Sequence, residues 1–370
     1  MVLTGPGLRA AARRRLPRFV FDFIDGGAGD EGGIRRNRAA LDAATLLPRA
    51  LTGIDAPDLG VTLFGETYAA PFAVAPMGLA NLVGPGTDAA LARAAAAAGI
   101  PYALSTAATT SMETLAPVAG RSLWLQLYIG RDPAITEHLI GRAEALGITT
   151  LIVTVDTPVP GRRPRDVANG FSFPPRPRPR LLLDMALRPR WALTMARGGV
   201  PGFRNLAPSA PAGGGSLIEM MRAQSSATTD WDTIAALRRR WKGALVVKGL
   251  LDPDDVVRAA GLGVDGVVVS NHGGRQLASL PAAITMLPAI RAAVGPEFPL
   301  LADGGVTSGE DVARLLAAGA TMALVGKAML YAAALGPGGP VKLVAGMRDD
   351  LLGATIQLGI HDWREYPSGG

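Results

Sequence analysis

Eight short apolar runs alternate with longer helical segments along this chain of 370 residues, and the alternation constrains its fold more than any other feature. Short runs of this kind are typical of buried strands in a parallel sheet, and the segments between them are long enough to return the chain across that sheet. Eight strands in this order predict a closed (β/α)8 barrel, or TIM barrel, in one domain that spans residues 1–370. An open doubly wound sheet is the alternative, but no glycine-rich dinucleotide turn follows the first run. The predicted strands are Phe72–Pro76, Tyr102–Ser105, Trp124–Tyr128, Leu151–Val155, Leu245–Lys248, Gly266–Ser270, Leu300–Asp303 and Ala323–Gly326.

Amphipathic segments fill the intervals between these runs. Several are introduced by Asp or Gly and end at Gly, as helices commonly do. The clearest predicted helices are Thr87–Ala98, Pro133–Leu146, Pro253–Leu262 and Gly309–Ala318.

One connection departs from the pattern, because residues 162–242 form a long insertion after the fourth predicted strand. Connections of this length usually serve as lids or binding segments, or are disordered. Within it, residues 176–204 interleave seven arginines with leucine, methionine and tryptophan, and residues 208–215 have the composition of a flexible linker. A basic amphipathic composition favours contact with an anionic membrane surface. The alternative is a solvated insertion that packs on the barrel or on a neighbouring subunit.

The formal net charge of +6 favours anionic partners, such as a phosphate cofactor, a carboxylate substrate or a membrane surface. Aromatic residues make up only 5% of the chain and no reading helix is evident, so we do not expect nucleic-acid binding. The chain has no cysteine, and its three histidines (His138, His272 and His361) lack the spacing of metal ligands, so no metal site is expected. No apolar signal segment follows Arg13–Arg15, which predicts a cytoplasmic protein.

Polar residues follow each predicted strand, at the end of a barrel where active sites form. The richest of these ends is the heptapeptide Ser270–Gln276, which places His272 three residues before Arg275 in a loop with two glycines. Histidine titrates near neutrality and arginine offers a planar fork of donors, so the pair suits proton abstraction from a carboxylic acid. The alternative is that both side chains only satisfy backbone groups of the loop. The other polar ends are Met77–Gly78, Ser105, Gln126, Tyr128, Thr154, Asp156, Lys248, Asp303–Gly305 and Gly326–Lys327.

The whole heptapeptide resembles the active-site signature of the FMN-dependent 2-hydroxy-acid dehydrogenases and oxidases. The resemblance extends from Leu16–Pro17 to about Leu330, and it is strongest to the mandelate dehydrogenase branch. It implies an enzyme that binds FMN across the mouth of the barrel and oxidises an (S)-2-hydroxy acid to a 2-oxo acid. A barrel that binds a phosphorylated ligand without redox chemistry and a flavin isomerase are the alternatives, and neither needs a carboxylate clamp beside a base.

The resemblance also implies a set of cofactor-binding residues. Pro76, Met77 and Gly78 match the segment that passes the reactive edge of the flavin. A lysine beside the flavin, here Lys248, would stabilise the negative charge that arises on reduction. The loops after the last two strands would hold the phosphate through bare backbone N–H groups and a helix amino terminus. The implied cofactor residues are Pro76, Met77, Gly78, Ser105, Gln126, Thr154, Lys248, Ser270, Asp303, Gly304, Gly305, Gly326 and Lys327.

For the substrate, the resemblance implies that Arg163 and Arg275 clamp the carboxylate and that Tyr128 contacts a substrate oxygen. His272 would take the proton from Cα or from the hydroxyl, and Asp156 would orient its ring and stabilise the imidazolium. Asp156 could instead only cap the turn before Pro158.

Three positions depart from the usual pattern of this family. Thr307 and Lys327 stand where arginines are usual, which should weaken the grip on phosphate because lysine cannot form a bidentate fork. Phe23 stands where a tyrosine usually holds the substrate carboxylate. A hydrogen bond to a charged group contributes about 1.5–3 kcal/mol, so we expect weaker binding of small acids.

Substrate size and electron acceptor follow from further matches. Ala107 replaces a bulky tryptophan of glycolate-type relatives, so the pocket should admit mandelate-like or other bulky acids. Gly78 is typical of the dehydrogenases, and the segment around Leu183–Asp184 and Arg188–Trp191 resembles the membrane-binding part of mandelate dehydrogenase. We therefore expect a peripheral membrane homo-oligomer, by resemblance a tetramer, that passes electrons to quinone. The alternative is a soluble oxidase that uses dioxygen and forms hydrogen peroxide.

Overall fold

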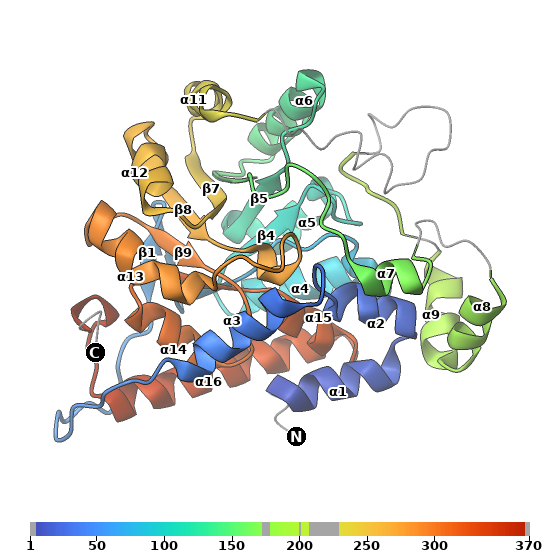
Figure 1. The fold of residues 1–370 in the computed structure, drawn as a ribbon, viewed down its shortest axis with the longest axis horizontal. Coiled ribbons are helices and arrows are strands. Elements are labelled where there is room, and N and C mark those ends of the chain that lie inside the picture. The colour runs from blue at the N-terminus through green and yellow to red at the C-terminus, as the bar shows by residue number, and fades with distance from the viewer. Residues whose placement is uncertain (1–4, 172–177, 200, 207–228, 367–370) are drawn as a thin grey trace.

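Eight parallel strands close into a barrel in the computed structural model, which describes residues 5–171, 178–199, 201–206 and 229–366 (Figure 1). Each strand pairs with its neighbour in sequence, and the last strand, β10, pairs with the first, β3. The predicted (β/α)8 barrel is therefore confirmed, and each predicted strand lies within two residues of an observed one. The barrel strands are β3 (Phe72–Val74), β4 (Tyr102–Ser105), β5 (Leu123–Leu127), β6 (Thr150–Thr154), β7 (Ala244–Leu250), β8 (Gly266–Val269), β9 (Leu300–Ala302) and β10 (Met322–Val325).

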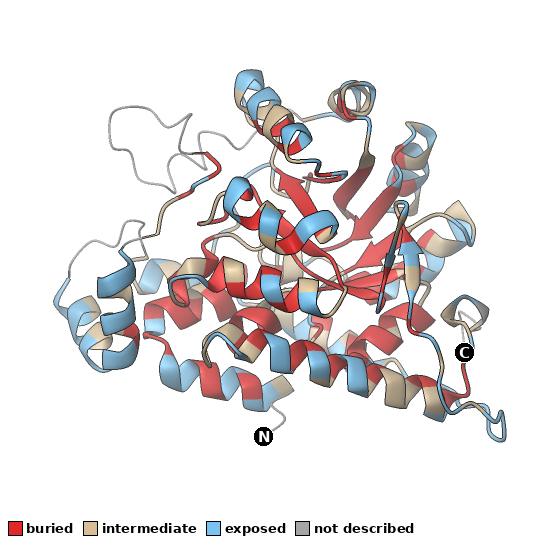
Figure 2. Ribbon diagram, turned by 180° about the vertical axis from the view of Figure 1, so that it is seen from behind, coloured by how far each residue is buried: buried red, intermediate tan, exposed pale blue. Residues whose placement is uncertain are grey.

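The strands are buried on both faces, as Figure 2 shows. Alternate side chains from all eight strands fill the inside of the barrel, with Trp124 the largest of them. The hairpin of β1 (Val61–Leu63) and β2 (Glu66–Tyr68) adds to this inner cluster, and Tyr68 accepts a hydrogen bond from the Trp124 indole at 3.1 Å. The polar chemistry is thus confined to the other end of the barrel, where the strands finish.

Helices cover the outside of the barrel and confirm the four that the sequence predicted most clearly. Side chains cap several helix starts: Asp132, Ser111, Asp252 and Ser308 each accept a backbone N–H of the first turn. These helices are α4 (Thr87–Ala97), α5 (Met112–Ala119), α6 (Pro133–Ala145), α11 (Trp231–Arg240), α12 (Pro253–Gly261), α13 (Ala283–Val294), α14 (Gly309–Ala317), α15 (Lys327–Ala333) and α16 (Gly339–Leu358). Before the barrel come α1 (Gly5–Arg15), α2 (Arg18–Asp25) and α3 (Gly32–Ala43).

The insertion after the fourth barrel strand begins with α7 (Pro164–Ala168), α8 (Pro179–Ala186) and α9 (Pro189–Gly198). Helices α8 and α9 project at one side of the molecule, next to α2 and α7 (Figure 1). Arg176 and the predicted linker at 208–215 lie outside the described residues. No helix of the described chain has the length and hydrophobicity to span a membrane.

The burial of Trp191 corrects one detail of the predicted membrane segment, in which this tryptophan was expected at the surface. Its indole is buried, donates a hydrogen bond to the Leu82 carbonyl at 2.9 Å and meets the Phe19 ring edge-on. Tryptophan therefore attaches α9 to the barrel and does not belong to the exposed surface. The large apolar side chains that α8, α9 and their connection expose are Leu182, Leu183, Leu187 and Leu193.

Candidate active site

A cavity of about 670 Å³ lies at the carboxyl ends of the barrel strands. This volume is within the usual range for a small ligand or cofactor. Gln126, Ser270 and Asp156 do not line the cavity but lie behind its wall and hold residues that do. The other residues predicted for the site all line it: Phe23, Pro76, Met77, Gly78, Ser105, Ala107, Tyr128, Thr154, Arg163, Lys248, His272, Arg275, Asp303, Gly304, Gly305, Gly326 and Lys327.

His272 lies three residues after the end of β8 in a backbone conformation that few residues adopt. Its φ of +56° lies in the left-handed region, which costs energy for a residue with a side chain. The Ser270 hydroxyl accepts the His272 N–H at 2.9 Å, and Asn271 exchanges amide hydrogen bonds of 2.9 and 2.7 Å with Asn37 of α3. A Cβ at Gly274 would lie 2.6 Å from the Ile34 nitrogen, so only glycine fits this close approach of α3. These contacts hold the strained loop and direct the imidazole into the cavity.

Asp156 pairs with His272 as the resemblance implied. Its Oδ1 lies 2.9 Å from His272 Nδ1, and its side chain is only 7% exposed. Burial alone would raise the pKa of Asp156, but the charge and hydrogen bond of His272 and the charge of Lys248 hold that pKa below its ordinary value. The carboxylate thus stays ionised, and Nε2 is the ring nitrogen left for a substrate.

Two guanidinium groups flank the ring of Phe23. Arg163 and Arg275 place their central carbons 5.3 and 5.5 Å from the ring centroid, and Phe171 stacks on it at 4.6 Å. Arg275 donates to three carbonyls at the end of α2: Gly26 at 2.6 Å, Phe23 at 2.9 Å and Ile24 at 3.2 Å. Enclosure by the cavity walls and the charge of Arg163 lower the pKa of Arg275 to about 9, so it remains cationic at neutral pH. Arg163 also pairs with the Asp166 carboxylate at 3.0 Å, so this group of three side chains keeps a net positive charge, which favours binding of an anion.

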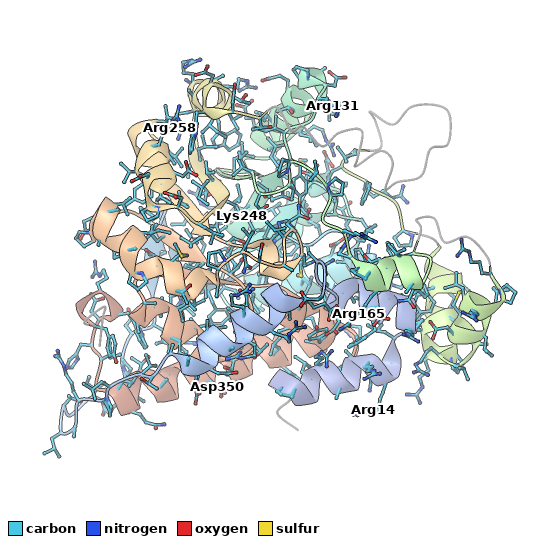
Figure 3. All side chains as sticks on the ribbon, in the orientation of Figure 1. Arg14, Arg131, Arg165, Lys248, Arg258 and Asp350 are labelled. Atoms are coloured by element: carbon cyan, nitrogen blue, oxygen red, sulfur yellow. The ribbon has the colours of Figure 1, made fainter. Side chains whose placement is uncertain are left out.

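Lys248 belongs to β7 and lines the cavity, and Figure 3 labels it near the centre of the molecule. Its ammonium lies 2.6 Å from both the Ser270 hydroxyl and the Asp303 carboxylate, and Ser270 also donates to Asp303 at 2.6 Å. The resemblance groups Asp303 with the loop that would hold the phosphate, and the structure shows that its carboxylate contacts Lys248 and Ser270. Asp303 therefore orients Lys248.

A buried polar row continues across three neighbouring strands. Ser105 donates to Gln126 Oε1 at 2.9 Å, and Gln126 donates to the Thr154 hydroxyl at 3.0 Å. Tyr128 lines the cavity beyond this row, and burial raises the pKa of its hydroxyl, which therefore remains a hydrogen-bond donor. Hydroxyl and amide groups of this kind match the carbonyl and N–H groups along one edge of an isoalloxazine ring.

The resemblance assigns the phosphate to the end of the cavity that contains Gly304 and Gly305, whose φ values of +105° and +90° require glycine. Lys327 also lines the cavity and donates to the Asp25 carbonyl at 2.8 Å, and desolvation and the charge of Arg275 lower its pKa to about 7. Thr307 bonds to Asp311 through both its N–H (2.8 Å) and its hydroxyl (3.0 Å). Arg38 of α3, which sequence reasoning missed, donates to the Gly305 carbonyl at 3.2 Å.

Phe171, Phe203, Leu206, Ile129 and Ile135 also line the cavity and were not predicted. They belong to loops, a helix start and the insertion, where no periodicity marks an inward face. Only a search for apolar residues next to predicted catalytic loops could have suggested Ile129, which directly follows Tyr128.

The fold and these side chains define a barrel enzyme that binds a small anion beside an acid–base pair. The comparison with known proteins gives the particular class, because the family model for FMN-dependent dehydrogenase matches residues 12–368. The chain therefore belongs to that family. It is an FMN-dependent oxidoreductase that acts on the CH–OH group of 2-hydroxy acids. It is 42% identical over 358 residues to an L-lactate dehydrogenase of Caulobacter vibrioides. The alignment covers 96% of this chain and 93% of that protein.

Solved structures of two further enzymes resemble this one. The monotopic membrane protein (S)-mandelate dehydrogenase superposes with a TM-score of 0.91 at 35% identity. The superposition covers 97% of this chain and 96% of the chain of that enzyme. Mandelate oxidase superposes with a TM-score of 0.85 at 34% identity, and that superposition covers 100% of this chain and 98% of the oxidase chain. Family membership therefore sets aside the non-redox barrel and the isomerase as functions of this chain.

The donor set fits FMN. The row from Ser105 to Thr154, together with Lys248, would hold the isoalloxazine ring, and the glycine loop with Gly326 and Lys327 would hold the phosphate. The paired arginines and His272 remain for the substrate.

Proposed function

We propose that this enzyme oxidises (S)-2-hydroxy acids with bulky, mandelate-like side chains to the corresponding 2-oxo acids. The observation that carries the proposal is the apolar wall beside the catalytic groups. Ala107 lines the cavity with only a methyl group. A Cβ at the neighbouring Gly78 would lie 3.1 Å from the Ala107 Cβ, so glycine suits this close approach. Phe171, Phe203 and Leu206 face the same cavity and supply apolar surface for a large side chain.

In this proposal the two arginines, Arg163 and Arg275, bind the carboxylate, and Tyr128 donates a hydrogen bond to a substrate oxygen. His272 then removes a proton from Cα or from the hydroxyl through Nε2. Asp156 stabilises the resulting imidazolium. Bound FMN would supply the acceptor for the two electrons that leave the substrate.

L-Lactate is the second candidate substrate, because the curated relatives named L-lactate dehydrogenase share more residues with this chain than the mandelate enzymes do. Anaerobic mixing of the purified flavoprotein with (S)-mandelate, L-lactate and glycolate separates the two. We expect the second-order rate constant of flavin reduction to be highest with (S)-mandelate. Faster bleaching by lactate would assign the enzyme to the lactate group instead.

We further propose that the enzyme binds the cytoplasmic face of an anionic membrane and passes electrons to quinone. The exposed leucines of α8 and α9 stand among arginines such as Arg180, Arg190 and Arg197, and no acidic residue other than Asp184 interrupts the two helices. Buried apolar side chains and about 1 kcal/mol for each basic residue near anionic lipid would then attach the protein.

Sedimentation with anionic liposomes tests this location. The intact enzyme should sediment with the vesicles, and a variant with Leu182, Leu183, Leu187 and Leu193 changed to serine should not. Negligible binding by both, together with rapid peroxide formation in air, would establish the soluble oxidase. Light scattering of the detergent-free protein tests the tetramer that the family resemblance implies.

A further inference from the structure

A short segment of the insertion, residues 201–206, returns to the barrel and lies against the loop that follows β4. We name these residues the wall segment. The Arg204 N–H donates to the Ala108 carbonyl at 3.3 Å, which places the wall segment next to Ala107. Phe203 and Leu206 are buried, and both line the cavity that holds the catalytic groups.

The side chain of Asn205 fastens the wall segment to this loop. Its Oδ1 accepts the N–H of Met112, the first residue of α5, at 2.9 Å. Its Nδ2 lies 3.4 Å from the carbonyls of both Ser105 and Thr110. The residue is 1% exposed, so water has no access to replace these contacts. Asparagine is suited to this position because one side chain offers both the acceptor and the two donors.

A second contact fixes the backbone of the wall segment. Arg142 of α6 donates to the Asn205 carbonyl at 2.7 Å and binds Glu113 of α5 through two bonds of 2.8 and 2.9 Å. Asn205 is thus held on its side chain by the β4–α5 loop and on its carbonyl by α6. Neither contact involves a group that would touch the carboxylate or the reacting carbon of a substrate.

We propose that Asn205 is a positioning residue for substrate specificity: it holds Phe203 and Leu206 as the wall against which the side chain of a bulky 2-hydroxy acid packs. This inference rests on the proposed function, and it identifies the part of the cavity that distinguishes large acids from small ones. A small acid such as glycolate has no side chain that reaches the wall. Loss of the wall should therefore raise KM for mandelate and leave glycolate almost unchanged.

The test compares Asn205→Ala with the parent enzyme on glycolate and on (S)-mandelate. Loss of about 1.4 kcal/mol of apolar contact corresponds to a tenfold change in affinity. We expect KM for mandelate to rise about tenfold, kcat to change less than threefold, and both constants for glycolate to remain within about twofold. The dissociation constant of benzoylformate, followed through the flavin spectrum, should rise in parallel.

Asn81→Ala is the matched control. Asn81 also donates its side-chain amide to the loop after β4, to the Thr110 hydroxyl at 3.2 Å, but among the described residues no hydrogen bond joins it to the wall segment, and it does not line the cavity. We expect the control to keep the mandelate-to-glycolate ratio of the parent. If Asn205→Ala yields no folded flavoprotein, Phe203→Ala and Leu206→Ala must each lower the same ratio.

The outcomes separate this inference from the proposed function. Equal losses on both acids, or equal ratios in Asn205→Ala and Asn81→Ala, would overturn the role of the wall segment while leaving the oxidation of bulky acids in place. If the parent itself reduces its flavin with glycolate or lactate faster than with mandelate, the proposed function fails first.

Discussion

Replacing Asp156 by asparagine tests the acid–base pair most directly. The change keeps the size of the side chain and can keep a hydrogen bond to His272 Nδ1, now 2.9 Å from Asp156 Oδ1, but it removes the negative charge. Two unit charges about 4 Å apart interact with about 4 kcal/mol at an effective dielectric constant of about 20. Because Asp156 is only 7% exposed, solvent does not replace the lost charge.

The amide dipole recovers part of this interaction, so we expect the imidazolium to lose about 3 kcal/mol of stabilisation in the transition state. Since about 1.4 kcal/mol corresponds to a factor of ten in rate, flavin reduction should slow on the order of 10²-fold. The assay is anaerobic stopped-flow reduction by saturating (S)-mandelate, with rates normalised to bound flavin.

Glu66→Gln provides a control for carboxylate loss away from the site. Glu66 pairs with Arg121 at the closed end of the barrel and should leave the reduction rate within about twofold of the parent. A reduction rate for Asp156→Asn within threefold of the parent would refute the reasoning, because it would mean that the carboxylate does not stabilise the charged ring.

Three further changes test other parts of the site. His272→Ala should keep the flavin spectrum and lower the reduction rate by roughly 10²-fold or more, the scale of lost acid–base catalysis; parental rates would remove His272 from the mechanism. Phe23→Tyr adds a hydroxyl next to the two arginines and should lower KM for L-lactate about tenfold, whereas an unchanged KM would show that the ring does not face the carboxylate. The pKa of Lys327, lowered to about 7, is raised again when a phosphate anion binds beside it, so FMN binding should take up a proton above pH 7 and weaken as the pH rises. Calorimetry in buffers of different ionisation enthalpy measures this uptake, which Lys327→Met should abolish; an unchanged uptake in that variant would exclude Lys327 as its source.

Much of the catalytic end could be predicted from the sequence because a barrel brings the ends of all its strands together. Once eight apolar runs were identified, residues as far apart as Tyr128 and Lys248 had to meet at one mouth. The pairing of Asp156 with His272, which spans 116 positions, was inferred in the same way, with the family resemblance to name the partners. The surface of the predicted membrane segment was harder to predict, because composition alone does not distinguish an exposed leucine from a buried tryptophan such as Trp191.

The alternation of apolar runs and helical segments by itself determined the barrel, the order of its strands and the end that carries the chemistry, since these depend on local periodicity and connection length. Tertiary structure alone decided how the catalytic groups are held. The carbonyls at the end of α2 receive Arg275 and Lys327, Asn37 of α3 locks the loop of His272, and Asn205 fixes the wall of the cavity. Such contacts join elements far apart in sequence, and they arise only when close packing of the whole chain decides which buried polar groups can satisfy one another.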